Sequence, residues 1–593
     1  CFMNKNFFQT AREMDLAEKR RLDRRGQLLS WLRLTTFFLC LLALAAAWDT
    51  GALEIYLVAV ALACCFTALL RRHGRLFEQR LLLESHIAAL SNFLARFSGE
   101  WHNFPVTGAE YLKDELPQAQ DLSLFGADSI YQYLCAARTK AGRDSLADAL
   151  SPFPADLALA RKRQKAVEEL ITRPRLVLDL TAAAALLPDG HDTKPLLAAL
   201  QRNTEKPYAG TAFIAWVLPA ALALAIVGAS LSLIGWTMPA ILVLLQFLIA
   251  FALGRRTASA QKPLAAMHRE LRLYERLFSR LEDATFQSPH LIALQAQLKA
   301  GGAARSLRRL AALADHAHTR HNLIFLLLAN AFFLSDLHFA HRIAHWQEKT
   351  AAHLGDWLAT WAETEVLLSL STVGLVREVY AFPELLEDAS PRLEAKNLTH
   401  LLIPEEKAVP NDIDATAGTR IITGSNMSGK TTYLRTVASA CVLAYAGAPV
   451  PGERFRLSPL HIFTSIRVTD DAAHGLSTFY AEILRIKSMM AFKEKRLPML
   501  IVIDEIFKGT NSADRLIGAR EAISRLTGAD FITLVSTHDF ELCEIESDAA
   551  PVTNWHFEES YEDDKLLFDY KIKEGRCTTR NAQYLLKMAG IME

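Results

Sequence analysis

The sequence predicts a multidomain protein with two transmembrane helical hairpins, an α-helical domain and a C-terminal α/β domain. Three observations lead to this prediction. The chain has 593 residues, more than one ordinary domain needs. Its mean hydropathy of +0.13 is high for a soluble protein, and its apolar residues gather in two pairs of long runs. After Pro383, helical periodicity gives way to short β-rich runs that alternate with helices.

These observations divide the chain into five regions, of which the fourth contains an insertion. They are a basic N-terminal segment at 1–28, a first transmembrane hairpin at 29–72, a helical linker at 73–120, a helical domain at 121–382 interrupted by a second hairpin at 210–254, and an α/β domain at 383–593.

The composition excludes several classes of protein. The 65 basic and 65 acidic residues cancel, so bulk charge does not indicate a strongly basic nucleic-acid binder, although a local basic surface stays compatible. A charged fraction of 22% argues against wholesale disorder. The eight cysteines include no CxxC pair, which argues against a zinc ribbon or a disulfide framework and fits a reducing compartment.

The first apolar pair runs from Leu34 to Trp48 and from Ile55 to Leu70, with a break at Asp49–Gly51. Each run is slightly shorter than the ~20 residues that cross a bilayer, and flanking residues can extend it. The second run and the basic residues after it argue against a cleaved signal peptide. Arginines stand on both outer flanks, and the positive-inside rule therefore places both ends in the cytoplasm. These arginines are Arg20, Arg21, Arg24, Arg25, Arg71, Arg72 and Arg75.

The second apolar pair repeats this pattern. Thr211–Ile234 carries no charge, Gly235–Pro239 supplies a turn, and Ala240–Leu253 is apolar again. Basic residues again stand outside both ends, at Arg202, Lys206, Arg255 and Arg256. We therefore expect four transmembrane helices in the cytoplasmic (inner) membrane of a prokaryote, with the α/β domain in the cytoplasm. A third stretch, Leu323–Leu334, is shorter and predicts a buried helix of the soluble part.

Helical periodicity dominates the region before Pro383. A stripe of apolar residues at spacings of three and four predicts a long helix that starts near Pro263, and Gly301-Gly302 ends the following segment. The residues of the stripe are Leu264, Met267, Leu271, Tyr274, Phe278 and Leu281. After Pro383, four β-rich runs alternate with helices and predict a mostly parallel sheet. These runs are Arg420–Thr423, Ile462–Ile466, Leu500–Ile503 and Phe531–Ser536.

Residues 424–431 fit the pattern G-x-x-x-x-G-K-[ST] between a strand and a helix. Glycines let backbone N–H groups surround phosphates, Lys430 can neutralise the β- and γ-oxygens, and the Thr431 hydroxyl can bind Mg²⁺. The strand–loop–helix context favours this interpretation over a purely structural loop. The expected nucleotide-binding residues are Gly424, Ser425, Asn426, Met427, Ser428, Gly429, Lys430, Thr431 and Thr432.

An apolar run from Met499 ends in two carboxylates, Asp504 and Glu505. The run is typical of a buried parallel strand, whose end lies near the glycine loop in such folds. Asp504 is then expected to hold Mg²⁺ together with Thr431, and Glu505 to polarise an attacking water. His538 follows the next strand and can contact the γ-phosphate or orient the water. The alternatives are a solvated turn for the carboxylates and a capping loop for His538.

Four segments resemble, in the same order, the motifs of the MutS mismatch-repair ATPases. They are Thr423–Arg435 with Asn-Met inside the loop, Asp470–Glu482, which resembles the signature segment, Asp504–Asn511, which resembles the extended Walker B motif, and Ser536–His538, which resembles the switch histidine. Three upstream segments resemble the helical core of the family more weakly, namely Leu124–Leu134, Arg161–Leu170 and Glu363–Leu385. The sequence is identified as a membrane-anchored MutS-like member that lacks the mismatch-recognition domain.

The resemblance implies an ABC-type P-loop ATPase that works as a homodimer on ATP with Mg²⁺. Ser477 and Thr478 of one subunit then approach the γ-phosphate bound by the other. Lys430, Glu505 and His538 are the implied catalytic residues, and Asn411 helps to shape the nucleotide pocket. Double-stranded DNA is the macromolecular partner that the resemblance suggests.

Some family features are absent or altered. Mismatch-recognising members use a Phe-x-Glu motif near the N-terminus, which the first 120 residues do not contain, and Phe492–Glu494 has the spacing inside the α/β domain instead. Leu476 replaces an expected Arg, and Phe507-Lys508 replaces Gly-Arg. We therefore expect ATP hydrolysis, coupled to duplex DNA binding with little or no mismatch specificity. An ABC-type transporter and a nucleotide-switched membrane scaffold for a protein partner are the alternatives; the missing LSGGQ motif disfavours the transporter.

Two further clusters have open interpretations. His338, His341 and His345 share one helical face, which permits a metal site. The lack of a nearby cysteine or an acidic residue in register favours an ordinary polar face. Arg305, Arg308 and Arg309 form a basic cluster that either contacts phosphates of DNA or lipid or is simply solvated.

Overall fold

The structure is a computed structural model, and it describes residues 2–576 with short gaps. The gaps are 114, 155, 202–209, 255–263, 320–322, 388–389, 426, 468–477, 508–511, 546, 548–549 and 563–564. The α-helices of the N-terminal two thirds are α1 (Phe2–Thr50), α2 (Leu53–Ser98), α3 (Pro117–Asp121), α4 (Ile130–Leu134), α5 (Lys140–Ala149), α6 (Leu157–Ile171), α7 (Pro174–Ala184), α8 (Lys194–Gln201), α9 (Thr211–Ser230), α10 (Thr237–Gly254), α12 (His268–Asp283), α13 (Pro289–Gly301), α14 (Ala303–Thr319), α15 (Leu323–Phe333) and α16 (Ser335–Val376).

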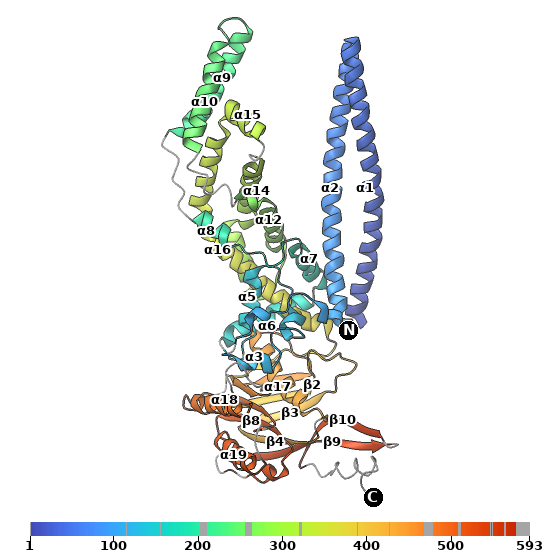
Figure 1. Ribbon diagram of the computed structural model, residues 1–593, viewed down its shortest axis with the longest axis vertical. Coiled ribbons are helices and arrows are strands. Elements are labelled where there is room, and N and C mark those ends of the chain that lie inside the picture. The colour runs from blue at the N-terminus through green and yellow to red at the C-terminus, as the bar shows by residue number, and fades with distance from the viewer. Residues whose placement is uncertain are drawn as a thin grey trace.

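Two apolar helical hairpins, α1–α2 and α9–α10, project from the same end of the molecule, opposite the α/β domain (Figure 1). Helices α1, α2 and α9 are long and apolar enough to cross a membrane. The apolar stretch of α10, Thr237–Ala252, is shorter than a full span. The pairing predicted from sequence is therefore confirmed, whereas within the described residues three of the four expected helices have the length and composition of a span.

Helices α1 and α2 extend well beyond their apolar runs. Each continues as one helix through the boundary expected between hairpin and flanking segment. At the base of the hairpin, the Phe8 ring stacks on Phe93 with centroids 4.7 Å apart, and both side chains are buried. This contact joins the first turns of α1 to the last turns of α2 at the base of the hairpin.

Helix α15 is a short apolar helix that lies beside the second hairpin. Its Leu327, Leu328, Phe332 and Phe333 side chains are exposed, so the prediction of a buried helix was wrong. The apolar content of α15 is explained by its position against α10, where it continues the apolar surface of the hairpin.

The apolar stripe predicted after Pro263 is confirmed, but a turn interrupts the helix that carries it. Leu271, Tyr274, Phe278 and Leu281 are buried along α12, and Pro263 lies outside the described residues. A turn at Met267 separates Leu264 from this helix. The following helix α13 ends as predicted at Gly301, and Gly302 adopts a left-handed conformation that closes the helix.

The α/β domain contains two sheets. In the larger sheet the order is β10-β9-β4-β8-β7-β6, and all neighbours are parallel except β9 and β10. The smaller sheet has the order β1-β5-β2-β3. The strands are β1 (Glu384–Leu385), β2 (Arg392–Leu398), β3 (Asn411–Thr416), β4 (Gly418–Thr423), β5 (Arg454–Leu457), β6 (His461–Ser465), β7 (Met499–Asp504), β8 (Phe531–Thr537), β9 (Val552–Glu562) and β10 (Lys565–Glu574). The helices of this domain are α17 (Lys430–Ala446), α18 (Thr478–Lys493) and α19 (Ser512–Arg525).

The four predicted strands correspond to β4, β6, β7 and β8, so the mostly parallel sheet is confirmed. All residues of β8 and all but the last of β7 are buried. Central parallel strands are covered on both faces and therefore consist of continuous apolar runs.

One buried carboxylate joins the helical domain to this sheet. Asp121, at the end of α3, is fully buried and accepts hydrogen bonds from the Thr464 hydroxyl at 2.7 Å and the Arg467 backbone N–H at 3.0 Å. It also forms an ion pair with Arg485 of α18 at 2.8 Å. A buried charge is tolerated only when it is paired and hydrogen-bonded, so Asp121 fixes α3 against the edge of the sheet.

Candidate functional site

The loop between β4 and α17 depends on two glycines. Gly424 has φ +146°, and a Cβ at this position would lie 2.9 Å from the backbone oxygen of Phe557. Gly429 has φ +105° and precedes the first turn of α17. Both conformations are accessible to glycine at little cost. The loop therefore brings the N-terminus of α17, with its unpaired backbone N–H groups, to the edge of the sheet.

Lys430 is the first residue of α17, and its side chain is buried. Its ammonium group donates to the carbonyl oxygens of Gly424 at 2.6 Å and Ser425 at 2.7 Å. The cation thus lies within the curve of the loop, where two loop carbonyls hold it. The Ser425 hydroxyl donates to Glu559, and Asn426 lies outside the described residues.

Thr431 and Asp504 meet although they come from different elements. The Thr431 hydroxyl donates to one carboxylate oxygen of Asp504 at 2.7 Å, and the Ser536 hydroxyl donates to the other. Strand β8 lies between β4 and β7, with Asp504 level with Ser536 and Thr423 level with Thr537. The carboxyl ends of three parallel strands therefore meet at one edge. A hydroxyl and a carboxylate are hard oxygen donors that suit Mg²⁺.

Glu505 and His538 are in contact at the same edge. The imidazole Nε2 of His538 is hydrogen-bonded to the Glu505 carboxylate. Glu505 has φ +53°, and its backbone N–H donates to the backbone oxygen and the hydroxyl of Ser536, each at 3.1 Å. The left-handed conformation is rare for a non-glycine residue and marks a constrained position. It turns the Glu505 side chain toward His538 at the end of β7.

A cavity of about 350 Å³ lies beside the first turn of α17. Met427, Lys430 and Thr431 line one side, and Tyr570 and His400 line another. Burial, with the nearby Arg435 and Arg377, lowers the pKa of His400 to about 3, so this imidazole is neutral at physiological pH.

Asn411 also lines this cavity, at the start of β3. Its side-chain amide donates to the backbone oxygen of Tyr570 at 2.9 Å and accepts from the backbone N–H of Ile572 at 2.9 Å. Asn411 thus ties β10 to β3 and positions Tyr570 at the mouth of the cavity.

Only residues 478–482 of the signature segment lie within the described part of the chain. Ser477 is outside the described residues, and Thr478 is the first residue of α18. Helix α18 packs on β6, the edge strand, which is separated from β4 by β7 and β8. Three strand spacings correspond to about 14 Å. The body of α18 thus lies on the flank of the sheet away from β4, while its first turn lies beside the end of β7, where the Phe479 and Phe507 ring centroids are 5.6 Å apart.

Two residues of the site were missed by the sequence analysis. Glu559, from β9, accepts the hydrogen bond of Ser425, and Tyr570, from β10, borders the cavity. Both come from an antiparallel hairpin that the sequence analysis did not identify. The alternation of polar and apolar residues between positions 552 and 574 is the signal that could have indicated it.

A strand, a glycine loop and a helix, with an adjacent acidic strand end, are typical of P-loop nucleotide-binding domains. Residues 420–593 match the family described as MutS domain V. The chain is also 32% identical over 238 residues to the "DNA mismatch repair protein MutS" of Natronomonas pharaonis, a match that covers 39% of this chain and 27% of that protein. The protein of the same description from Roseiflexus sp. is 32% identical over 226 residues, which cover 36% and 20% of the two chains.

The C-terminal part of the chain, residues 420–593, therefore matches a domain of the MutS family. The prediction of a MutS family member is thereby confirmed. The matches span 27% and 20% of the length of these two relatives.

Proposed function

We propose that this chain is a membrane-anchored MutS-type ATPase. The observation that carries the proposal is the convergence of Lys430, Thr431, Asp504, Glu505 and His538 at the carboxyl ends of β4, β7 and β8. Sequence positions far apart supply one cation, one pair of oxygen donors and one carboxylate–imidazole pair. Phosphoryl transfer to water needs these three groups.

Each group has a role set by its position. Lys430 exchanges the carbonyls of its own loop for the β- and γ-phosphate oxygens, and the N-terminus of α17 adds backbone N–H donors. Thr431 and Asp504 hold Mg²⁺, which neutralises developing charge on the phosphates when bound. Glu505 accepts the proton of the attacking water, and His538 orients that carboxylate. The cavity bordered by Tyr570, His400 and Asn411 accommodates the base.

The active form is a homodimer with composite sites. Strand order supports this part of the proposal, because α18 packs on β6, which β8 and β7 separate from β4 and its glycine loop. Ser477 and Thr478 of a second copy then complete the phosphate site. Donors that close over the γ-phosphate stabilise the charge of the transition state.

The two apolar hairpins anchor the protein in the cytoplasmic membrane, with the ATPase domain in the cytoplasm. Their common direction and their exposed apolar side chains support this orientation (Figure 1). ATP turnover is coupled to binding of duplex DNA with little or no mismatch preference.

Replacement of the general base tests the ATPase. Glu505→Gln should retain ATP binding and lose hydrolysis by ~10²-fold or more, because an amide cannot accept the proton of water. Lys430→Ala should weaken ATP binding itself. Glu541→Gln, at an exposed position three residues beyond His538, is the matched control and should hydrolyse ATP at the wild-type rate. Wild-type turnover in Glu505→Gln excludes the assigned mechanism.

Membrane insertion is tested separately by cysteine labelling in intact cells. Cysteines placed at Gly51 and Gly235 should react with an impermeant reagent from outside. Positions near Arg71, Arg255 and Glu593 should react only after lysis, because basic flanks remain in the cytoplasm. A protected Gly235 contradicts insertion of the second hairpin.

A further inference from the structure

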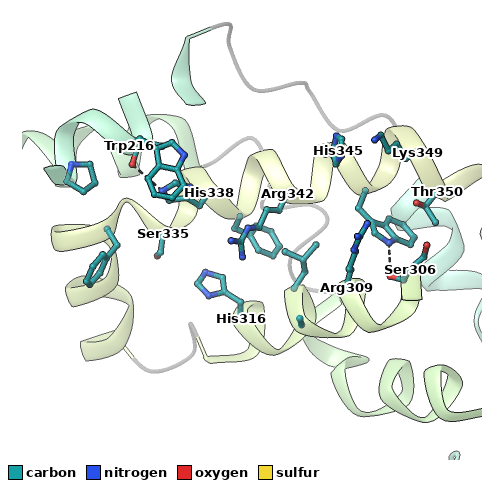
Figure 2. Close-up of a pocket in the computed structure, with 17 residues that line it drawn as sticks. Trp216, Ser306, Arg309, His316, Ser335, His338, Arg342, His345, Lys349 and Thr350 are labelled. Atoms are coloured by element: carbon teal, nitrogen blue, oxygen red, sulfur yellow. Dashed lines mark hydrogen bonds between the residues drawn. The ribbon is translucent and has the colours of Figure 1, made fainter. Parts of the chain in front are cut away.

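A large cavity lies where the second apolar hairpin meets the helical domain. It has a volume of about 900 Å³ and is bordered by α9, α14, α16 and the end of α15. It is separate from the nucleotide site, which lies in the α/β domain at the other end of α16. Figure 2 shows Arg309 and His316 projecting from α14 toward α16, and Arg342 projecting from α16 toward α14.

The cavity lining is positively charged. Arg309, Arg342 and Lys349 line it, and no carboxylate of the described residues does. These three side chains are exposed, and none of them forms a hydrogen bond or an ion pair with another described residue. Because no described carboxylate lines the cavity beside these three cations, they repel one another, and binding of an anion would stabilise the arrangement.

Neighbouring arginines on the same surface show a different arrangement. Arg308, next to Arg309 on α14, pairs with Glu275 at 2.6 Å, and Arg272 pairs with Asp315. The helices therefore place carboxylates against the arginines that face away from the cavity. The cations that face the cavity remain available to a ligand.

The opposite wall of the cavity is apolar. Ala215, Trp216 and Pro219 of α9 line it together with Phe333 of α15, and the Trp216 and Phe333 side chains are 72% and 67% exposed. His338 fixes this wall, because its Nε2 lies 3.1 Å from the Ala215 backbone oxygen and its ring packs edge-on against Trp216. Helix α9 is one of the helices able to cross a membrane. The apolar wall is thus continuous with a membrane-facing surface.

We propose that this cavity binds an anionic phospholipid. Arg309, Arg342 and Lys349 bind the phosphate headgroup, and the acyl chains lie along Trp216 and Phe333. Guanidinium groups match the geometry of phosphate oxygens, and basic pockets beside membrane helices on the cytoplasmic side bind phospholipid headgroups. Tryptophan is typical of the level where headgroups meet hydrocarbon.

The two kinds of wall favour a lipid over other sources of phosphate. A nucleic acid or free phosphate supplies negative charge but leaves Trp216 and Phe333 exposed to water. A zwitterionic lipid covers the apolar wall but leaves the net positive charge uncompensated. An anionic lipid satisfies both. This inference rests on the membrane location proposed above and is independent of the ATPase.

The test is a lipid titration of the full chain in neutral detergent, followed by quenching of tryptophan fluorescence. The probes are phosphatidylglycerol and phosphatidylcholine with the same brominated acyl chains, and inorganic phosphate serves as a competitor. Brominated phosphatidylglycerol should quench saturably at a mole fraction at least tenfold lower than brominated phosphatidylcholine. Trp216→Phe should remove much of this signal, because Trp216 borders the cavity.

Matched variants locate the site. Arg309→Gln/Arg342→Gln should raise the half-saturating mole fraction at least tenfold. Lys299→Gln/Arg305→Gln removes the same charge from exposed positions on α13 and α14 outside the cavity lining and should behave as wild type. Ala312→Phe reduces the cavity without changing charge and should also weaken quenching.

Three results would overturn the proposal. Equal quenching by the two brominated lipids shows that charge is not recognised. Equal behaviour of the two double variants shows that binding occurs elsewhere. Displacement by inorganic phosphate at concentrations equal to those of phosphatidylglycerol shows a site for a free anion. Because the titration uses micelles, its failure is distinguishable from failed membrane insertion, which the labelling experiment measures.

Discussion

Strand β8 and helix α1 are both rich in apolar residues, yet their environments are opposite. Every residue of β8 is buried between the layers of the α/β domain. None of the most apolar part of α1 is buried, and its Leu42 and Trp48 side chains are 65% and 86% exposed. The apolar side chains are removed from water inside the protein in one region, whereas in the other they stay exposed on the protein surface.

Length and flanking charge distinguish the two cases. The β8 run is only seven residues long and ends at polar Ser536 and Thr537, of which Ser536 belongs to the candidate site. The α1 run is long enough to approach the thickness of a bilayer and has arginines at its base. A short run bounded by site residues therefore indicates a core strand, and a long run bounded by basic residues indicates a membrane helix.

A charged side chain placed in each region tests whether their environments differ in this way. Val502→Asp puts a carboxylate at a fully buried position of β7 and should lower the free energy of unfolding of the α/β domain by ~4 kcal/mol or more. Leu42→Asp should leave that domain unchanged and instead oppose membrane insertion by ~3 kcal/mol. Thermal unfolding of the domain and membrane fractionation measure the two effects.

Ile517→Asp is the matched control in the α/β domain, because Ile517 of α19 is 71% exposed. It should unfold as wild type does. If Leu42→Asp lowers the thermal stability of the α/β domain as much as Val502→Asp, the two regions do not differ in the way described.

A carboxylate in the helical domain gives a second test of internal burial, because other parts of the protein cover it completely. Glu365 of α16 accepts hydrogen bonds from the backbone N–H groups of Arg138 and Thr139, at 2.9 and 3.2 Å, yet burial raises its pKa to about 7. The unfolded chain ionises this group near 4.5, while the folded chain keeps it protonated. The stabilisation that protonated Glu365 gives to the folded state is therefore complete below pH 4.5. It is lost as pH rises to about 7, which lowers the free energy of unfolding by ~3 kcal/mol.

The free energy of unfolding of wild type and Glu365→Gln, measured between pH 4.5 and 8, checks this prediction. The difference between the two proteins should change with pH only in this window. A constant difference shows that Glu365 titrates at its ordinary pKa in the folded protein.

The smallest expected effect concerns DNA. We expect the exposed apolar regions to contact lipid. A chain with zero net charge should bind duplex DNA weakly, through phosphate contacts alone. Affinity should fall with salt with a slope of roughly −0.9 per contact, and a mismatch should change it by less than tenfold, about 1.4 kcal/mol. Titrations of matched and mismatched duplexes at several salt concentrations measure both. A larger mismatch preference reveals an element inserted between bases.

Local signals in the sequence predicted the central strands and the loop between β4 and α17. Periodicity and the glycine–lysine spacing are properties of neighbouring residues, so they are visible without a structure. The contacts of Thr431 with Asp504 and of Glu505 with His538 agree with the predicted grouping of these residues, although their roles remain predictions.

Features made by distant residues were not predictable in this way. The smaller sheet pairs β2 with β3 and β5, and Asn411 reaches across to β10, both through tertiary contacts. The full lengths of α1 and α2 also escaped prediction, because their polar halves carry no apolar run. The cavity between α9 and α16 is lined by residues more than 100 positions apart, so no motif could describe it.

Helix α16 connects the second apolar hairpin with the α/β domain as a single rod. Its 42 residues correspond to about 63 Å. One end holds α9, where His341 lies 2.9 Å from the Thr211 hydroxyl, and just beyond the other end Arg377 donates to the carbonyl of Ile403 at 2.6 Å. A tilt of about 5° at the Arg377 end displaces the far end by roughly 5 Å over a rod of this length. Helix α16 therefore has the dimensions of a lever arm, in which a small rotation beside the α/β domain would become a larger displacement of the second apolar hairpin.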